Sequence, residues 1–156
     1  MIELALKMKS AKFAPRARRV KQRLEDLRPV WPAVADELDR CIEQVFHDEG
    51  GASGQWAALS PEYEKRKHPD HGILRRTDAL FTSLTRKFSA KAVFKVRKQG
   101  FTRGTKLLYA KFLQGGTKFM PARPIYDLRE NHKRRIRSVL RQQLKALAVS
   151  VGIEVK

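Results

Sequence analysis

The stretch that decides the fold is residues 107–124, which read LLYAKFLQGGTKFMPARP. The pattern predicts a short apolar helix, a break at the glycine pair Gly115-Gly116 and a brief extended piece. Pro121 and Pro124 fix their own φ angles and bias the residues before them away from helix. We therefore expect Arg123 on a stiff, extended backbone, which suits a fixed docking contact better than catalysis.

Several short motifs occur in order along the chain and resemble those of one known family. Residues 109–117 have the form Tyr-Ala-x-aromatic-x-Gln-x-Gly-Thr, and residues 121–124 read Pro-Ala-Arg-Pro. Upstream lie Gly54-Gln55-Trp56 with Leu59-Ser60-Pro61, and then Ile73-Leu74-Arg75 with Thr77 and Leu80. In order and spacing, these residues resemble the phage virion morphogenesis family, the small tail-completion proteins of Mu-like and related tailed phages.

The resemblance covers roughly residues 1 to 148 and has local departures. Asp78 stands where the family usually has glycine. Leu113 and Gly115 replace a common His and Phe on either side of Gln114. These differences concern loop detail.

Composition bounds the class of protein. A chain of 156 residues fits a single domain, and we expect one tail-completion or neck-type domain over 1–156 with a short flexible C-terminal end. No apolar run approaches the roughly 20 residues of a membrane span, and the N-terminus does not resemble a signal peptide. The single cysteine, Cys41, excludes an internal disulfide and fits a reducing cytoplasm. Lys and Arg number 34 against 16 Asp and Glu, and the net charge of +18 implies a polyanionic or acidic partner.

The order of periodic segments predicts an α+β fold, with a small, mostly antiparallel sheet flanked by helices. After the basic stretch Arg16 to Arg23, a first short helix is expected to run to about Leu27. Further helices are expected from Pro32 to the glycines at 50 and 51, from Ser60-Pro61, after an N-cap at Thr77, and after a capping box of Asp127 and Glu130. The long second helix and the last helix are expected to pack on one face of the sheet. Strands are expected at residues 2–8, 88–96, near 105–108 and near 117–120, with Gly100 to Gly104 as a hairpin tip or mobile loop.

Basic residues gather in clusters with little acidic compensation. The last helix carries such a face opposite its apolar stripe, and this face is either a surface for DNA phosphates or simply solvated. Aromatic residues are not interleaved with the charges, so any duplex would be contacted through its backbone. The candidates for contact with DNA or an acidic surface are Arg16, Arg18, Arg19, Lys65, Arg66, Lys67, Arg103, Arg134, Arg137 and Arg141.

Residues that could support catalysis do not form a recognisable site. His68, Asp70 and His71 are close in sequence, but a zinc site needs about four ligands, and a polar turn at Pro69 explains them better. Neither Cys41 nor Ser60 lies in a motif that would place a base beside it. We therefore expect no enzymatic activity, no metal and no cofactor.

The resemblance implies a structural role at the phage neck or the head-proximal end of the tail, as a tail terminator or tail completion protein. It further implies a ring, a hexamer by family analogy, around the DNA path. The partners would be further copies of the chain, neighbouring neck and tail-tube proteins, and packaged double-stranded DNA in the lumen, but no membrane. The protein would occupy the host cytoplasm during assembly and then the virion.

Candidates for contacts between subunits or with a neighbouring ring are Trp56, Gln114, Gly116, Arg123 and Pro124. Trp56 anchors its loop and can also seat a neighbouring subunit. Gln114 is either a tie to the backbone or an inter-subunit hydrogen bond. The main alternative function is a sequence-independent, basic DNA-binding protein, and a nuclease using His68 or His71 is a third.

Overall fold

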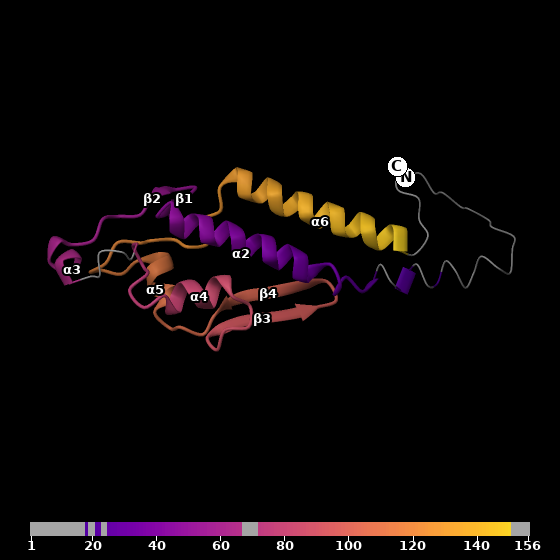
Figure 1. Cartoon of the computed structure of the whole chain (residues 1–156), viewed down its shortest axis with the longest axis horizontal. Coiled ribbons are helices and arrows are strands. Elements are labelled where there is room, and N and C mark those ends of the chain that lie inside the picture. The colour runs from indigo at the N-terminus through magenta and orange to yellow at the C-terminus, as the bar shows by residue number, and fades with distance from the viewer. Residues whose placement is uncertain (1–17, 19–20, 23–24, 67–71, 151–156) are drawn as a thin grey trace, which may run out of the picture.

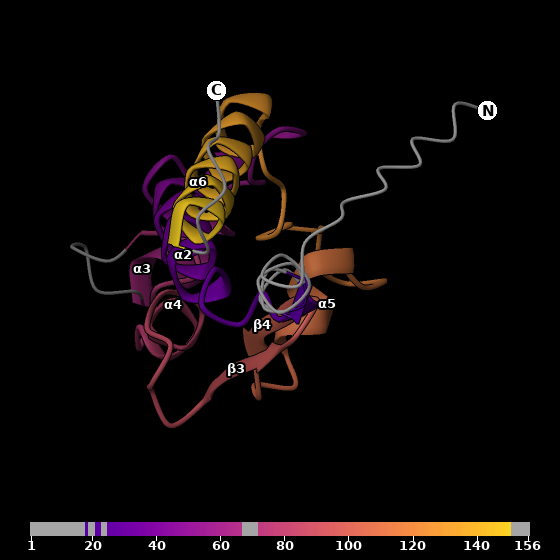
Figure 2. The ribbon, with the colours of Figure 1, turned by 90° about the vertical axis from the view of Figure 1, so that its right-hand side faces the viewer.

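The computed structural model describes residues 18, 21–22, 25–66 and 72–150. Its elements form three layers, in the order α6, α2, and then α4 with a β-hairpin (Figure 1). Turned by 90°, the molecule shows the same order, with α6 and the hairpin on opposite sides of α2 (Figure 2). The structure confirms the predicted α+β class. The strand expected at residues 2–8 lies outside the described residues, as does most of the helix expected before Leu27.

Helix α2 (Trp31–His47) is the central element of the fold. Pro32 occupies its first turn, where a missing N–H costs nothing, as the sequence predicted. Every position of the expected stripe is inward-facing: Leu38 packs against the core, and the others are buried, namely Val34, Cys41, Ile42, Val45 and Phe46. The apolar face therefore spans the whole helix, and α2 contacts α4 and the hairpin on one side and α6 on the other.

The glycines after α2 have a different role from the one expected. The helix already ends at His47, and Gly50–Gly51 forms strand β1, which pairs antiparallel with β2 (Gly54–Gln55). Gly51 is required by close packing, because a β-carbon there would lie 2.2 Å from the carbonyl oxygen of Asp127. Helix α3 (Pro61–Arg66) follows and begins where Ser60-Pro61 predicted.

Helix α4 (Ala79–Thr85) starts later than expected. Its N-cap is Asp78 and not Thr77, and the Asp78 side chain makes no capping bond because it pairs with Arg75. Asp78 has a φ of 52°, in the left-handed region that glycine adopts without strain. The backbone conformation therefore accounts for the glycine that the resembled family carries at this position.

The basic segment after α4 is a regular hairpin. Strand β3 (Ala92–Arg97) pairs antiparallel with β4 (Gly100–Thr105) from Ala92↔Thr105 to Arg97↔Gly100. The interpretation of residues 100–104 as a tip or mobile loop was therefore wrong, since Lys98 and Gln99 form the turn and 100–104 belong to the strand. The expected start at Phe88 was also wrong, because Phe88 is 91% exposed before the strand begins. The described residues contain two separate two-stranded sheets where one sheet was expected.

Helix α5 (Ala110–Gly115) is the short apolar helix predicted from residues 107–124. It ends at Gly116, whose φ of 73° is left-handed. The strand expected near 117–120 is instead a tight turn closed by a single bridge between Thr117 and Met120.

Helix α6 (Glu130–Ser150) lies antiparallel to α2 and packs along it (Figure 1). Its predicted stripe is confirmed, because Leu147 is buried and the rest pack with Val30 and Val34, namely Ile136, Val139, Leu140 and Leu144. Asp127 does not cap this helix as expected, since its carboxylate accepts a hydrogen bond of 2.7 Å from the Ser53 amide. None of the helices in the described residues combines the length and apolar character needed to cross a lipid bilayer.

Candidate functional site

The five residues expected at contacts between subunits meet at one place inside the chain. Two segments come together there: the loop after β2, residues 56–58, and the stretch from α5 to residue 126. We call these five residues the loop clamp; they are Trp56, Gln114, Gly116, Arg123 and Pro124. Sequence separations of 65 to 68 residues are bridged by direct hydrogen bonds.

Arg123 is the centre of the loop clamp. Its side chain is buried, with 6% of the residue exposed. The guanidinium donates from Nε to the carbonyl of Ala57 at 2.9 Å and from Nη2 to the carbonyl of Ala58 at 3.0 Å. The backbone N–H of Arg123 donates to the carbonyl of Leu113 at 2.7 Å. Residues 121–124 form neither helix nor strand, and the arginine side chain in this proline-flanked stretch is directed inward.

Trp56 approaches the same place from the opposite segment. Its indole N–H donates to the carbonyl of Pro124 at 2.9 Å, and its ring packs edge-on against Phe46 with centroids 5.5 Å apart. Trp56 is 6% exposed and belongs to the main core cluster. Trp56 therefore anchors its loop, as expected, through contacts within a single chain.

Gln114 and Gly116 shape the chain before Arg123. The Gln114 side-chain carbonyl accepts from the backbone N–H groups of Ile125 at 2.9 Å and Tyr126 at 3.2 Å. Of the two roles left open for Gln114, the tie to the backbone is the one its geometry supplies. At Gly116, a β-carbon would lie 2.8 Å from the backbone nitrogen of Ala122, so the chain reverses where a side chain has no room.

Arg123 is therefore placed differently from the docking contact that its motif suggested. Its donors to Ala57 and Ala58 are used inside the fold, where they satisfy carbonyl groups that the loop leaves without secondary-structure partners. The side chain that sequence reasoning assigned to a partner instead closes the tertiary structure.

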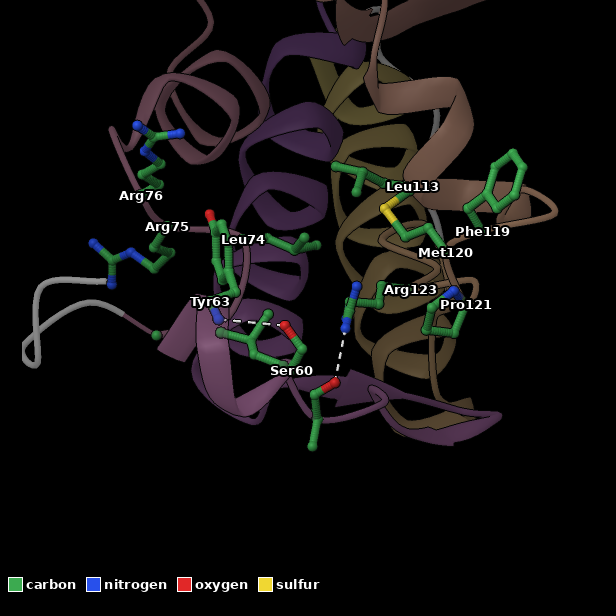
Figure 3. Close-up of a pocket in the computed structure, with 13 residues that line it drawn as sticks. Ser60, Tyr63, Leu74, Arg75, Arg76, Leu113, Phe119, Met120, Pro121 and Arg123 are labelled. Carbon is green, nitrogen blue, oxygen red and sulfur yellow. Dashed lines mark hydrogen bonds between the residues drawn. The ribbon is translucent and has the colours of Figure 1, made fainter. Parts of the chain in front are cut away.

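A groove of about 550 Å³ includes Arg123 of the loop clamp in its lining (Figure 3). Leu74, Leu113 and Met120 lie around its centre, and Arg123 forms part of its lower side. Ser60 and Tyr63 of the α3 turn lie across from Met120, joined to each other by a bond of 3.3 Å from the Tyr63 amide to the Ser60 hydroxyl. The groove is apolar in its centre and has polar groups at its edge, a surface typical of a protein-binding site.

Several large apolar side chains of the segment 108–119 face solvent. Phe119 is 92% exposed and lines the groove, and Leu108 is 82% exposed at the start of α5. Tyr109 and Phe112 on the same short segment are 45% and 46% exposed. Four exposed large apolar residues within positions 108–119 are more than the scattered single residues that are normal on a surface.

The basic candidates differ in their placement. Arg18 is exposed, as are Lys65 and Arg66 on α3 and Arg134, Arg137 and Arg141 along one side of α6. Two of them have carboxylate partners: Arg66 pairs with Glu62, and Arg137 lies 2.5 Å from Glu130. Arg16, Arg19 and Lys67 lie outside the described residues.

Arg103 is not available for DNA. Its side chain is 1% exposed and pairs with Asp39 of α2 through Nε to Oδ1 at 2.8 Å and Nη2 to Oδ2 at 3.2 Å. Its Nη1 also donates to the carbonyl of Ser83 at 3.0 Å. Burial raises the pKa of the Asp39 carboxyl, and the bonds from Arg103 oppose that rise. The expectation of an exposed contact was wrong because the strand alternation turns position 103 inward, toward α2.

The nucleophile and metal candidates do not form a reactive site in the described residues. Cys41 is fully buried, and burial raises the pKa of its thiol, which disfavours the reactive thiolate. No group of three His, Cys, Asp or Glu side chains in the described ranges is placed to hold a metal ion. His68, Asp70 and His71 lie outside those ranges.

Sequence reasoning missed a buried polar cluster between α2 and α6. Glu37 accepts from Arg135 Nε at 2.7 Å, and Gln44 accepts from Arg135 Nη1 at 3.1 Å and from His132 Nε2 at 3.2 Å. His132 is 0% exposed. Helical spacing in the sequence could have placed both residues on inward faces. Glu37 lies between the inward positions 34 and 38 of its stripe, and His132 precedes Ile136 by one helical turn.

Comparison with known proteins gives one match. The model of the phage virion morphogenesis family matches residues 9–145, which include the loop clamp, the groove and most of α6. Neither any curated protein nor any solved structure matches the chain.

Proposed function

The chain belongs to the phage virion morphogenesis family and has a role in phage virion assembly, and from this premise we propose that it acts at the head–tail junction. There it would complete or terminate the tail as a ring around the DNA path. The observation that carries the proposal is the family match over residues 9–145, most of the chain. The loop-clamp residues fall within the motifs of the family resemblance, so in this chain those motifs serve the fold.

Ring formation is supported by the apolar surface beside the groove. A net charge of +18 makes copies of this chain repel one another, so a stable ring needs apolar contacts to offset that repulsion. Leu108, Phe112 and Phe119 offer such contacts, and the groove lined by Leu74 and Met120 offers a receptor for them. Because Phe119 also lines the groove, these side chains and the groove together supply an apolar surface on which a neighbouring copy of the chain would pack.

A non-catalytic role is supported by the use of the polar motif residues. The side chains of Arg123, Gln114 and Trp56 form hydrogen bonds with the backbone of the same chain. The surfaces left over are apolar or basic, which suits assembly by shape and charge. The protein would work in the host cytoplasm during assembly and remain in the virion.

The decisive experiment is a nonsense mutation early in the gene, followed by electron microscopy of the lysate. DNA-filled heads beside separate tails, or tails of abnormal length, are the expected result, and the two phenotypes distinguish joining from length termination. Normal infectious particles would overturn the proposal.

The ring contact can be tested with a matched pair of variants. Phe119→Asp should reduce oligomer formation in sedimentation velocity and fail to complement the nonsense mutant, because it places a charge in the contact. Phe88→Asp is the control, since Phe88 is equally exposed, at 91%, but lies on the turn between α4 and β3. Equal behaviour of the two variants would exclude residue 119 from the contact.

A sequence-independent DNA-binding protein is the second candidate, favoured by the basic surfaces of α3 and α6. A protein of this kind should bind duplex DNA as a monomer below micromolar concentration with a steep salt dependence. A ring-forming neck protein should bind weakly as a monomer and gain affinity only on assembly.

A further inference from the structure

The register of the β-hairpin gathers four basic residues on one of its faces. Alternate residues of a strand point to the same side, so the pairs Val93↔Gly104, Lys95↔Thr102 and Arg97↔Gly100 share a face. The hydrogen bond from the Lys106 amide to the Lys91 carbonyl, 2.8 Å long, extends the same register by one more pair. We call this side the basic hairpin face; its cations are Lys91, Lys95, Arg97 and Lys106.

The opposite face of the hairpin packs against helix α2. Arg103 pairs with Asp39 of α2, and Phe101 packs against Trp31 with ring centroids 6.0 Å apart. Phe94 packs against Phe101 on the same side. The hairpin is therefore fixed to α2 by one face, and all four cations of the other face are exposed.

These cations differ from the other basic surfaces because no carboxylate accompanies them. In the described part of the chain none of the four forms an ion pair, whereas Arg66 pairs with Glu62 on α3 and Arg137 with Glu130 on α6. Lys106 makes only a bond of 3.3 Å to the carbonyl of Ala90. Unpaired cations on a rigid scaffold attract a polyanion without first having to release an internal partner.

The basic hairpin face also has open space beside two glycines of β4. On β4, Gly100 stands opposite Arg97 and Gly104 stands opposite Val93, and a β-carbon on either glycine would meet no described atom within 4 Å. From Lys91 to Arg97 the strand extends about 20 Å, at about 3.3 Å per residue. Over that length duplex DNA carries about 12 phosphate charges, so a rod of DNA can lie along the strand and meet several cations at once.

We propose that the basic hairpin face binds the phosphate backbone of double-stranded DNA, without reading its sequence. The inference rests on the proposed position around the DNA path and names the surface that would face the DNA. It transfers that role from Arg103, which is buried, to Lys91, Lys95 and Arg97. It also implies that the basic face of α6 contributes less to DNA binding, because Arg137 on that face already pairs with Glu130.

An acidic protein surface fits this face less well than DNA does. Protein interfaces are enriched in aromatic residues and depleted in Lys, particularly at their centres. Here three of the four cations are Lys, and the only large apolar side chain is Val93, which is half-buried. A surface without an apolar anchor suits long-range attraction to phosphates, which needs charge and not shape.

The test is a salt titration of DNA binding by the full chain. Affinity for a short fluorescent duplex is measured by anisotropy between about 50 and 200 mM NaCl. The triple variant Lys91→Gln, Lys95→Gln, Arg97→Gln should lower the slope of log K against log salt by about 2 to 3, at roughly 0.9 per lost phosphate contact. Its affinity should fall equally for duplexes of unrelated sequence.

The matched control removes the same charge from α6, with Arg134→Gln, Arg137→Gln and Arg141→Gln. Its slope should change by less than about 1, since the face of α6 would contribute less to DNA binding than the basic hairpin face does. An unchanged slope in the hairpin variant, or an equal loss in the α6 control, would overturn the proposal. So would a hairpin variant that binds DNA normally but no longer binds purified tails, which would assign the face to an acidic protein. Separate heads and tails in the nonsense mutant, together with an unchanged slope, would leave the proposed function standing and remove only this contact.

Discussion

Trp56 and Arg123 each donate hydrogen bonds to the backbone beside the other. The Trp56 indole donates to the carbonyl of Pro124, the neighbour of Arg123, and Arg123 donates to the carbonyls of Ala57 and Ala58, the neighbours of Trp56. Both side chains are almost fully buried, so each satisfies a backbone group that would otherwise lack a partner. Two segments without regular secondary structure are thereby held together by reciprocal contacts.

The first prediction concerns Arg123→Met, which keeps the aliphatic volume but removes both donors. We expect the free energy of unfolding in urea to fall by about 1 to 3 kcal/mol, because two carbonyls lose charged donors in a buried place. Arg76→Met is the control, since Arg76 is exposed at the same groove and its loss should stay within about 0.5 kcal/mol. Equal effects of the two variants would contradict the role of the loop clamp.

The second prediction uses the two adjacent glycines. Gly116→Ala should destabilise the protein by about 1 to 3 kcal/mol, because φ at this position is 73° and the new β-carbon would lie 2.8 Å from the Ala122 nitrogen. Gly115→Ala should be neutral or stabilising by up to about 1 kcal/mol, since it lies at the end of α5 with open space around it. Thermal unfolding of both variants measures the difference, and a reversed order would show that the turn relaxes around the methyl group.

The third prediction concerns the buried pair of Arg103 and Asp39. Arg103→Met alone should cost about 3 to 5 kcal/mol, because it leaves the Asp39 carboxylate buried without its cation. The double variant Arg103→Met, Asp39→Leu should recover most of that loss in chemical denaturation, since it removes both charges together.

The same double variant separates a structural role of Arg103 from a role in DNA binding. It leaves the net charge of the protein unchanged, so a general electrostatic effect is absent. We expect its salt slope for duplex DNA to equal that of the parent protein. A slope lowered by about 1 would instead show that Arg103 reaches a phosphate.

The sequence predicted the elements whose signals are local. The stripe from Val34 to Phe46 and the stripe from Ile136 to Leu147 repeat at helical spacing, and both helices form with those faces inward. The rigid backbone around Arg123 was also predictable, because proline restricts φ whatever surrounds it.

The direction in which a side chain points depended on tertiary contacts that local signals do not contain. Arg123 looked like a docking residue because its acceptors, Ala57 and Ala58, lie more than sixty positions upstream. Arg103 looked exposed because its partner Asp39 is on the distant helix α2 and because glycines on both sides of Arg103 suggested a loop. Asp127 had the spacing of a helix cap, but the close approach of the β1–β2 loop offered its carboxylate the Ser53 amide instead. In each case a contact distant in sequence replaced a plausible local one.

The last prediction follows from His132, which is buried between α2 and α6. With Nε2 donating to Gln44, its Nδ1 has no hydrogen-bond partner among the described residues, so protonation would add a buried N–H without an acceptor. Burial, and then the nearby charges of Arg129 and Arg135, lower the pKa of His132 below its ordinary 6.5, although Asp48 and Glu37 oppose this. The unfolded chain therefore binds the proton more tightly, and the stabilising contribution of neutral His132 is complete above about pH 6.5 and is lost as the pH falls.

We expect this group to reduce the free energy of unfolding by at most about 1.4 kcal/mol for each pH unit below 6.5. His132→Gln keeps a donor for Gln44 but cannot titrate, so urea unfolding at about pH 7.5 and 5.5 should show a smaller pH dependence than in the parent protein. The two proteins differ only at position 132, so the difference between their pH dependences isolates that residue. Identical pH dependences would mean that α6 moves to hydrate the imidazolium, because only access to water could remove the cost of charging a histidine at this position.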